Sequence, residues 1–322
     1  MNSVIKRNSR IGGPKCIAHF VASVVGLALI FSMATATAAT QQTFDSPQAA
    51  VDALVRAVSA NDETALYALF GPGSDKLLSS GDKTQDVHNR SVFSKAYQDA
   101  HRLDVLDNAL ATLVIGKDEW PMPIPLVKER GRWRFDTKKG ADEILARRIG
   151  RNELSTMKVC LAIVDAEREY ATRNLDADGV PQYTSHFVSR QGKRDGLYWP
   201  TAVDAPLSPL GALLAAAADE GYSHPGSNTL EPYHGYYYRF LTRQGKSAAG
   251  GARDYEIRGK LIGGFALLAY PARYGDSGIM SFIVNHDGVL FEQNLGPGTY
   301  TAARGITVFD PDSSWKKVDA AQ

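Results

Sequence analysis

The sequence has little cysteine and lacks the short motifs that hold common cofactors. Its 322 residues include only Cys16 and Cys160, with no Walker loop, no dinucleotide-binding glycine string and no C-x-x-C pair. No H-E-x-x-H or other short-spaced histidine pair suggests zinc. We therefore expect no cofactor, no metal and no disulfide framework, so that stability comes from buried apolar side chains. Cys160 itself lies in an apolar helical pattern, and we interpret it as a small buried hydrophobe rather than a nucleophile.

An excess of basic residues is also missing. The chain carries 36 Lys and Arg against 35 Asp and Glu. Without residues 1–40, which hold four basic and no acidic side chains, the balance becomes 32 against 35, a net charge near −3. Nucleic-acid binders usually show a basic balance, so we expect no nucleic-acid partner. The hydrophobic content of 44% and charged content of 22% are ordinary for a globular protein.

The one long apolar segment lies near the N-terminus. Four basic residues come first, an apolar run of roughly 14 residues follows, and residues 34–39 are small. This order is typical of a secretory signal peptide covering residues 1–39, cleaved after Ala36, Ala38 or Ala39. An uncleaved membrane anchor is the alternative, but a spanning helix needs about 20 apolar residues. We expect export to the periplasm or beyond the cell, and no stable membrane span after cleavage.

Residues 44–140 predict helices followed by strands. Ser46 and Pro47 are typical of an N-cap and a first helical residue, and Asp62 can cap a second helix. A third helical pattern covers residues 92–100. Strand patterns then cover residues 111–115, 122–127 and 132–135. Three helices that lead into a curved antiparallel sheet resemble the cone-shaped nuclear-transport-factor-2-like (NTF2-like) fold, which implies an apolar pocket but no particular function.

Residues 141–322 predict a long helix followed by an antiparallel sheet. The long helical pattern covers residues 141–173, with a kink at Gly150 and a buried stripe of Leu154, Met157, Leu161 and Val164. Further patterns predict a helix over 206–218 and strands over 236–241, 263–270, 279–284 and 289–293. This layout resembles the periplasmic head of type IV pilins, although their hydrophobic stem is absent. The predicted class is α+β, with domains at residues 44–140 and 141–322.

Three arginines gather in the long helical pattern, at Arg147, Arg148 and Arg151. They are candidates for an anion site. A solvated helix face paired with Glu143 and Glu153 is the simpler interpretation.

Aromatic residues supply the candidate ligand-binding site. We assign it to Tyr198, Trp199, Tyr233, His234 and Tyr236. Alternation along the strand sends Tyr236 and Tyr238 to one face and Tyr237 to the other. Such rings can stack on a glycan or a peptide. Ordinary packing within a sheet is the alternative, and no residue is assigned as catalytic.

Two short strings resemble known sites but lack required partners. Residues 275–278 (GDSG) resemble the string around a serine-protease nucleophile, yet the span is too short for the barrels of those enzymes. Residues 174–179 resemble the start of a calcium loop, but its twelfth position is Ser185 instead of a glutamate. We interpret both as turns.

Six short sequence segments, in the same order along the chain, resemble those of one protein family. They are WPMPIP (120–125), RRIGRNEL (147–154), YWP (198–200), SPLG (208–211), YHGYY (233–237) and GGFA (263–266). The chain is similar over nearly its whole length to the uncharacterised exported bacterial proteins grouped as domain of unknown function 2950. The resemblance implies export and a bacterial origin, but no activity, cofactor or site residue.

The leading hypothesis is an exported envelope protein that binds or scaffolds without catalysis, with an envelope protein or cell-wall component as partner. One alternative is a periplasmic hydrolase-like enzyme with a site near His234 and Asp195. That alternative requires His234, a carboxylate and a Ser or Tyr within about 3.5 Å in a cleft. The other alternative is a pilus-associated structural subunit.

Overall fold

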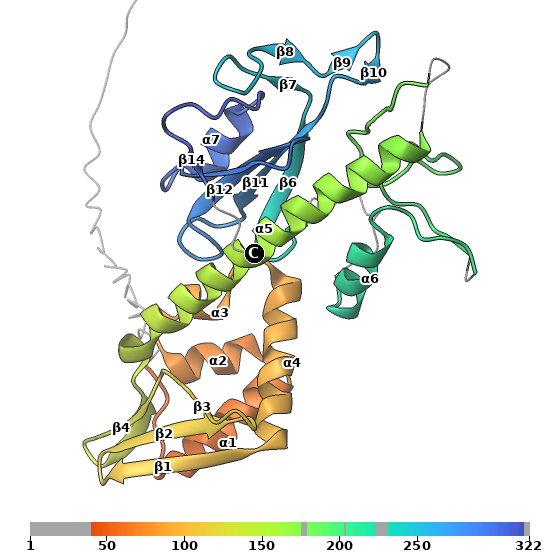
Figure 1. Cartoon of the computed structure of the whole chain (residues 1–322). Coiled ribbons are helices and arrows are strands. Elements are labelled where there is room, and N and C mark those ends of the chain that lie inside the picture. Colours follow the sequence, from red (N-terminus) through yellow and green to blue (C-terminus); the bar gives the residue numbers. More distant parts are fainter. Residues whose placement is uncertain (1–39, 175–178, 203, 223–230, 319–322) are drawn as a thin grey trace, which may run out of the picture. The chain divides into compact units, whose positions relative to one another are not determined.

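The computed structural model describes residues 40–174, 179–202, 204–222 and 231–318 (Figure 1). The predicted signal peptide and residues 175–178 of the predicted calcium-like loop lie outside the described residues. Helices and antiparallel sheets make up the fold, so the predicted α+β class is confirmed. The finer likenesses to the NTF2-like cone and the pilin head, and the boundary between residues 140 and 141, stay predictions.

The first part of the fold begins with capped helices. Helix α1 (Pro47–Ser59) starts after Ser46, whose Oγ accepts the Ala49 N–H at 3.1 Å. Helix α2 (Glu63–Phe70) starts after Asp62, whose carboxylate accepts the Ala65 N–H at 3.0 Å. Both predicted starts are confirmed, because each side chain satisfies an amide that the first helical turn leaves free. Helices α3 (Asp75–Leu78) and α4 (Lys83–Asp99) follow.

An antiparallel sheet follows these helices. Its strands are β1 (His101–Asp107), β2 (Leu110–Ile115), β3 (Trp120–Pro121), β4 (Leu126–Glu129) and β5 (Arg132–Phe135). Their order is β1-β2-β4-β5, and β3 pairs with β2. Pro121 ends the short strand β3, and Pro123 and Pro125 lie between β3 and β4, outside the paired residues, in keeping with the tendency of proline to occupy strand ends and edges. The apolar faces of the sheet and of α1 and α2 share one core, which includes Leu54, Leu66, Leu69, Ile124 and Phe135.

Helix α5 (Thr137–Arg173) contains 37 residues, so it is about 55 Å long. It confirms the predicted long helix and stays continuous through Gly150. The predicted buried stripe is wrong at Leu154, whose side chain is 58% exposed. The buried face of the second half instead carries Val159, Cys160 and Ile163, because this is the face that packs toward the second sheet.

The second sheet is also antiparallel, with the order β14-β13-β12-β11-β6. Its strands are β6 (Tyr236–Leu241), β11 (Ala266–Pro271), β12 (Met280–Asn285), β13 (Leu290–Asn294) and β14 (Lys316–Lys317). Every residue of β11 is buried, in keeping with its place between β12 and β6. Tyr236 and Tyr238 pack in the core on the α5 side, while Tyr237 packs in a second core with α7 (Thr299–Gly305). The predicted alternation of these tyrosines is therefore confirmed.

Shorter elements complete the described chain. Helix α6 (Gly211–Asp219) precedes β6, and two small ribbons pair β7 (Arg243–Gln244) with β8 (Arg253–Asp254) and β9 (Glu256–Ile257) with β10 (Lys260–Leu261). None of the helices in the described ranges combines the length and the apolar character that crossing a bilayer requires.

Candidate ligand-binding pocket

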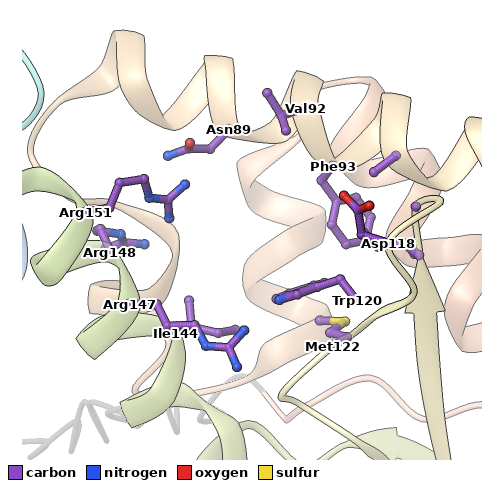
Figure 2. A pocket seen from close by; sticks show the side chains of 13 residues that line it. Asn89, Val92, Phe93, Asp118, Trp120, Met122, Ile144, Arg147, Arg148 and Arg151 are labelled. Atoms are coloured by element: carbon purple, nitrogen blue, oxygen red, sulfur yellow. The ribbon is translucent and has the colours of Figure 1, made fainter. Parts of the chain in front are cut away.

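A pocket of about 580 Å³ lies between α4, the β2–β3 connection and the first half of α5 (Figure 2). Its volume is within the range of small-molecule sites. The larger apolar side chains that line it are Val92, Phe93, Ile115, Trp120, Met122 and Ile144. Its polar lining consists of Asn89, Asp118, Arg147, Arg148 and Arg151. We call this space the outer pocket.

The spacing of residues on α5 explains its contribution to the outer pocket. Ile144 and Arg148 are four residues apart, as are Arg147 and Arg151. Residues three and four apart share one face of an α-helix, so this short segment presents three guanidinium groups to the same space. Figure 2 shows these side chains on α5, across the pocket from Phe93 and Trp120.

The three arginines have different partners. Arg147 forms an ion pair with Glu143, and its guanidinium lies 5.8 Å from the centre of the Trp120 ring. Arg148 is only 7% exposed and donates to the carbonyl oxygens of Lys76, at 2.8 Å, and Leu77. Those carbonyls lie in α3, so the cation meets groups that a helix C-terminus leaves without partners.

Arg151 differs from both neighbours. It is exposed, and within the described part of the chain its guanidinium donates to no acceptor. Burial lowers the pKa of Arg148, an effect that the nearby carboxylates of Asp86 and Asp276 oppose. An arginine nevertheless keeps its proton in a protein. The outer pocket therefore has three permanent positive charges on one wall, and among the described residues only the Arg151 side chain is without a hydrogen-bond or ion-pair partner.

The predicted pairing of these arginines with glutamates is only partly right. The pair of Arg147 and Glu143 is confirmed. Glu153 instead accepts the backbone N–H groups of Ile279 and Met280, both at 2.9 Å, because it lies on the side of α5 that faces the second sheet. Arg148 is buried, which contradicts a fully solvated face.

A family model described as "Protein of unknown function (DUF2950)" matches residues 41–318. The chain belongs to this family. The match includes the outer pocket and both large sheets, and it confirms the resemblance found in the sequence strings. Searches among curated proteins and among solved structures gave no significant match.

Four of the five residues predicted to bind a ligand in the DUF2950 chain share one hydrophobic core: Tyr236 is buried in it, and Tyr198, Trp199 and Tyr233 pack against it. Tyr236 is 0% exposed, and its hydroxyl donates to the Met280 carbonyl at 2.9 Å. Tyr233 and His234 lie together, with ring centres 4.1 Å apart. The other two predicted residues line two neighbouring cavities, both of which are also bordered by Pro200 and Thr201. Trp199 lines one of about 640 Å³ and Tyr198 one of about 300 Å³.

The carboxylate beside His234 is that of Glu220, with 3.5 Å between His234 Nε2 and Glu220 Oε2. Tyr222 is also near, but its hydroxyl already donates to Asp82 at 2.8 Å and accepts the His234 N–H at 3.1 Å. Gly235 N–H donates to the same Asp82 oxygen at 2.9 Å. These bonds tie the start of α4 to the start of β6. Burial raises the pKa of Tyr222 and lowers that of His234.

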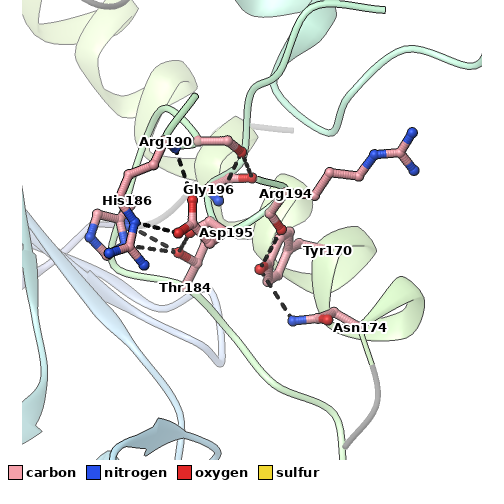
Figure 3. Close-up of polar contacts among 9 residues, drawn as sticks. Tyr170, Asn174, Thr184, His186, Arg190, Arg194, Asp195 and Gly196 are labelled. Carbon is pink, nitrogen blue, oxygen red and sulfur yellow. Dashed lines mark hydrogen bonds and ion pairs between the residues drawn. The ribbon is translucent and has the colours of Figure 1, made fainter. Parts of the chain in front are cut away.

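Asp195, the other residue of the predicted enzyme site, belongs to a loop of the DUF2950 chain (Figure 3). Its carboxylate accepts the Arg190 backbone N–H at 2.9 Å and also binds the Arg190 side chain. Its carbonyl accepts the Thr184 hydroxyl at 2.8 Å. Asp195 therefore closes a turn instead of meeting His234.

The GDSG string also forms a turn, as predicted. Ser277 is fully buried, and its hydroxyl donates to the Arg273 carbonyl and accepts the Arg273 N–H. Its oxygen is therefore engaged within the loop and does not face a cleft.

The sequence marked Arg147, Arg148 and Arg151 as a candidate anion site but favoured a solvated helix face, and it gave no indication of the other residues that line the outer pocket. Asn89, Phe93, Trp120 and Met122 come from two segments whose meeting no local pattern reveals. Two signals were available: the resemblance of residues 44–140 to the NTF2-like fold, which implies an apolar pocket, and the place of Ile144 on the same helix face as the arginines.

Proposed function

We propose that this protein is an exported binding protein whose outer pocket holds a small amphipathic anion. The observation that carries the proposal is the guanidinium of Arg151, which has no partner among the residues that the structure describes and lies on the same wall as Arg147 and Arg148, opposite an apolar surface.

The positive wall supports an acidic head group. A guanidinium presents a planar set of donors that matches a carboxylate, sulfate or phosphate, and such charge-assisted bonds are stronger than neutral ones. Arg148 is fixed by its two carbonyl acceptors, so it supplies charge without moving. Arg151 has no competing partner among the described residues, so a ligand displaces no ion pair there.

The opposite wall supports an apolar body. Val92 is 53% exposed although it is a large aliphatic side chain, and it lines the pocket beside Phe93, Trp120 and Met122. Covering this surface removes apolar area from water, which favours binding by about 25 cal/mol per Å². A ligand with both an acid and an apolar part satisfies both walls.

Binding is favoured over catalysis by the residues that line the outer pocket. They include no His, Cys, Ser or Tyr among the described positions, and the only carboxylate is the exposed Asp118. The pocket therefore offers strong hydrogen-bond donors, but no nucleophile held beside a base.

A head-group series in isothermal titration calorimetry tests the proposal. Octanoate should bind, whereas octylammonium, with the same tail and the opposite charge, should not. The double variant Arg147→Gln/Arg151→Gln should weaken octanoate binding by at least about tenfold, because it removes charge-assisted hydrogen bonds. Lys139→Gln/Lys158→Gln also removes two positive charges, at exposed positions of α5 outside the pocket, and should leave the affinity within about twofold. Equal binding of the two head groups would overturn the anion site.

Export has its own support in the order of basic, apolar and small residues at the N-terminus. N-terminal sequencing of the native protein from a periplasmic fraction should find a chain that begins at residue 37, 39 or 40. An intact Met1 on a cytosolic pool would contradict export.

A further inference from the structure

A smaller cavity adjoins the outer pocket. Its volume is about 160 Å³, and we call it the inner recess. Five residues line both spaces, namely Asn89, Phe93, Met122, Ile144 and Arg148. The same side chains border both, so the two spaces are neighbours, and the inner recess is itself partly open to solvent.

The walls of the inner recess belong to the first hydrophobic core. Leu54, Leu66, Phe70 and Ile124 line it, and each of these side chains is at most 5% exposed. Leu78, at the end of α3, is half-buried and lines it from another side. An apolar group that enters the recess would therefore contact the interior of the fold.

The charged residues that border the recess already have partners. Asp86 accepts the Ser80 N–H at 3.0 Å, and Arg90 donates to Asn61 at 2.9 Å. Arg148 is held by the carbonyls of α3. These bonds do not need water from the recess, so an apolar guest leaves none of the named bonds broken.

The volume of the inner recess limits the size of the apolar group that it can hold. A cavity of about 150 Å³ lined by Leu, Ile and Phe accepts a benzene molecule in a protein interior. The inner recess has about 160 Å³, so it fits roughly six carbons, either as a ring or as the end of an alkyl chain.

We propose that the ligand is an acid with a single apolar tail whose end enters the inner recess between Phe93 and Met122, while its acid group stays at Arg147 and Arg151. This inference rests on the proposed function and deepens it to a ligand class, the single-tailed acids. Met122 suits the entrance, because an unbranched thioether side chain adapts to irregular space.

Chain-length profiles test the inference. Dissociation constants of the n-alkanoates from butanoate to dodecanoate are measured by calorimetry, below their micelle-forming concentrations. In the native sequence, affinity should rise about fourfold for each added methylene and then level off when the recess is full. Leu78→Trp should make the profile level off at a shorter chain, and Leu78→Ala at a longer one. Leu154→Ala, on an exposed position outside both spaces, should leave the profile unchanged.

The outcomes separate the two proposals. If alkanoates bind and depend on Arg147 and Arg151, but every Leu78 variant keeps the native profile, the recess holds no tail and only this inference fails. If no alkanoate binds the native protein, the anion site and the tail site both fail. Leu78→Ala keeps the test decisive if Leu78→Trp does not fold, which thermal unfolding will show.

Discussion

Glu167 on α5 is a buried carboxylate with incomplete hydrogen bonding. Its side chain is 0% exposed, and Oε2 accepts the Thr184 N–H at 3.1 Å. Oε1 has no hydrogen-bond partner within the described ranges. Burial raises the pKa of Glu167 from 4.5 to about 8, although the Thr184 bond acts in the opposite direction. Glu167 should therefore be mostly protonated in the folded protein at neutral pH.

This shift links stability to pH. Between the unfolded pKa of 4.5 and the folded pKa of about 8, the folded state holds a proton that the unfolded state has lost. The stability that protonated Glu167 contributes to the folded state is thus fully present below pH 4.5 and is lost as the pH rises through the folded pKa. The free energy of unfolding should fall by about 1.4 kcal/mol per pH unit in this range, or about 5 kcal/mol in total.

Glu167→Gln removes the titration while keeping an oxygen that can accept the Thr184 N–H. Urea unfolding is measured for both proteins from about pH 5 to about pH 9. The buried amide changes the free energy of unfolding of the variant by an amount that does not depend on pH. The difference in this free energy between the variant and the native sequence should rise by about 1.4 kcal/mol per pH unit. Asp142→Asn, at an exposed position of α5, should run parallel to the native sequence. Parallel curves for Glu167→Gln would refute the reasoning.

Three further predictions concern stability and reactivity. Asp82→Ala removes the cap of α4 and the acceptor of two other segments, so it should lower the free energy of unfolding by about 3–5 kcal/mol in urea titrations. Gly140→Ala should destabilise by about 1–3 kcal/mol, because its Cβ would lie 2.3 Å from the Pro123 carbonyl oxygen, whereas Gly150→Ala should stabilise by about 1 kcal/mol. Cys160 should not react with a thiol reagent until urea unfolds the chain, because burial raises its pKa.

Each of these three predictions has a control variant or an outcome that would contradict it. Asp62→Ala removes a cap that holds only its own helix, so its cost should stay near 1 kcal/mol. A similar cost for Asp82→Ala would mean that the bonds to Tyr222 and Gly235 add nothing. Equal signs for the two glycine variants would contradict the close approach at Gly140. Rapid labelling of Cys160 in the folded protein would contradict its burial.

Sequence patterns predicted the elements that local chemistry determines. Ser46 and Asp62 mark helix starts because their oxygens accept amides two or three residues ahead, which is a local interaction. Strand β11 was predictable from an unbroken apolar run. Its predicted start at Gly263 is three residues early, because the observed strand begins at Ala266.

Features that depend on distant contacts were harder to predict. Strand β1 was missed because it is an edge strand with mixed charged and apolar residues and no fully buried position. Leu154 was expected to be buried, since helical periodicity alone does not say that α5 has different partners along its length. The spacing of the arginines suggested a shared helix face, but the pocket that they line depends on Phe93 and Trp120, which meet them only in the folded chain.

Helix α5 lines the outer pocket with its first half and packs under the second sheet with its second half. Inserting one residue between Arg151 and Val159 would rotate these halves by about 100° relative to each other and lengthen the helix by about 1.5 Å. Either the guanidinium groups would leave the pocket or the apolar face would leave the sheet. Length changes among DUF2950 chains should therefore fall in loops such as residues 245–252, and not within this stretch of α5.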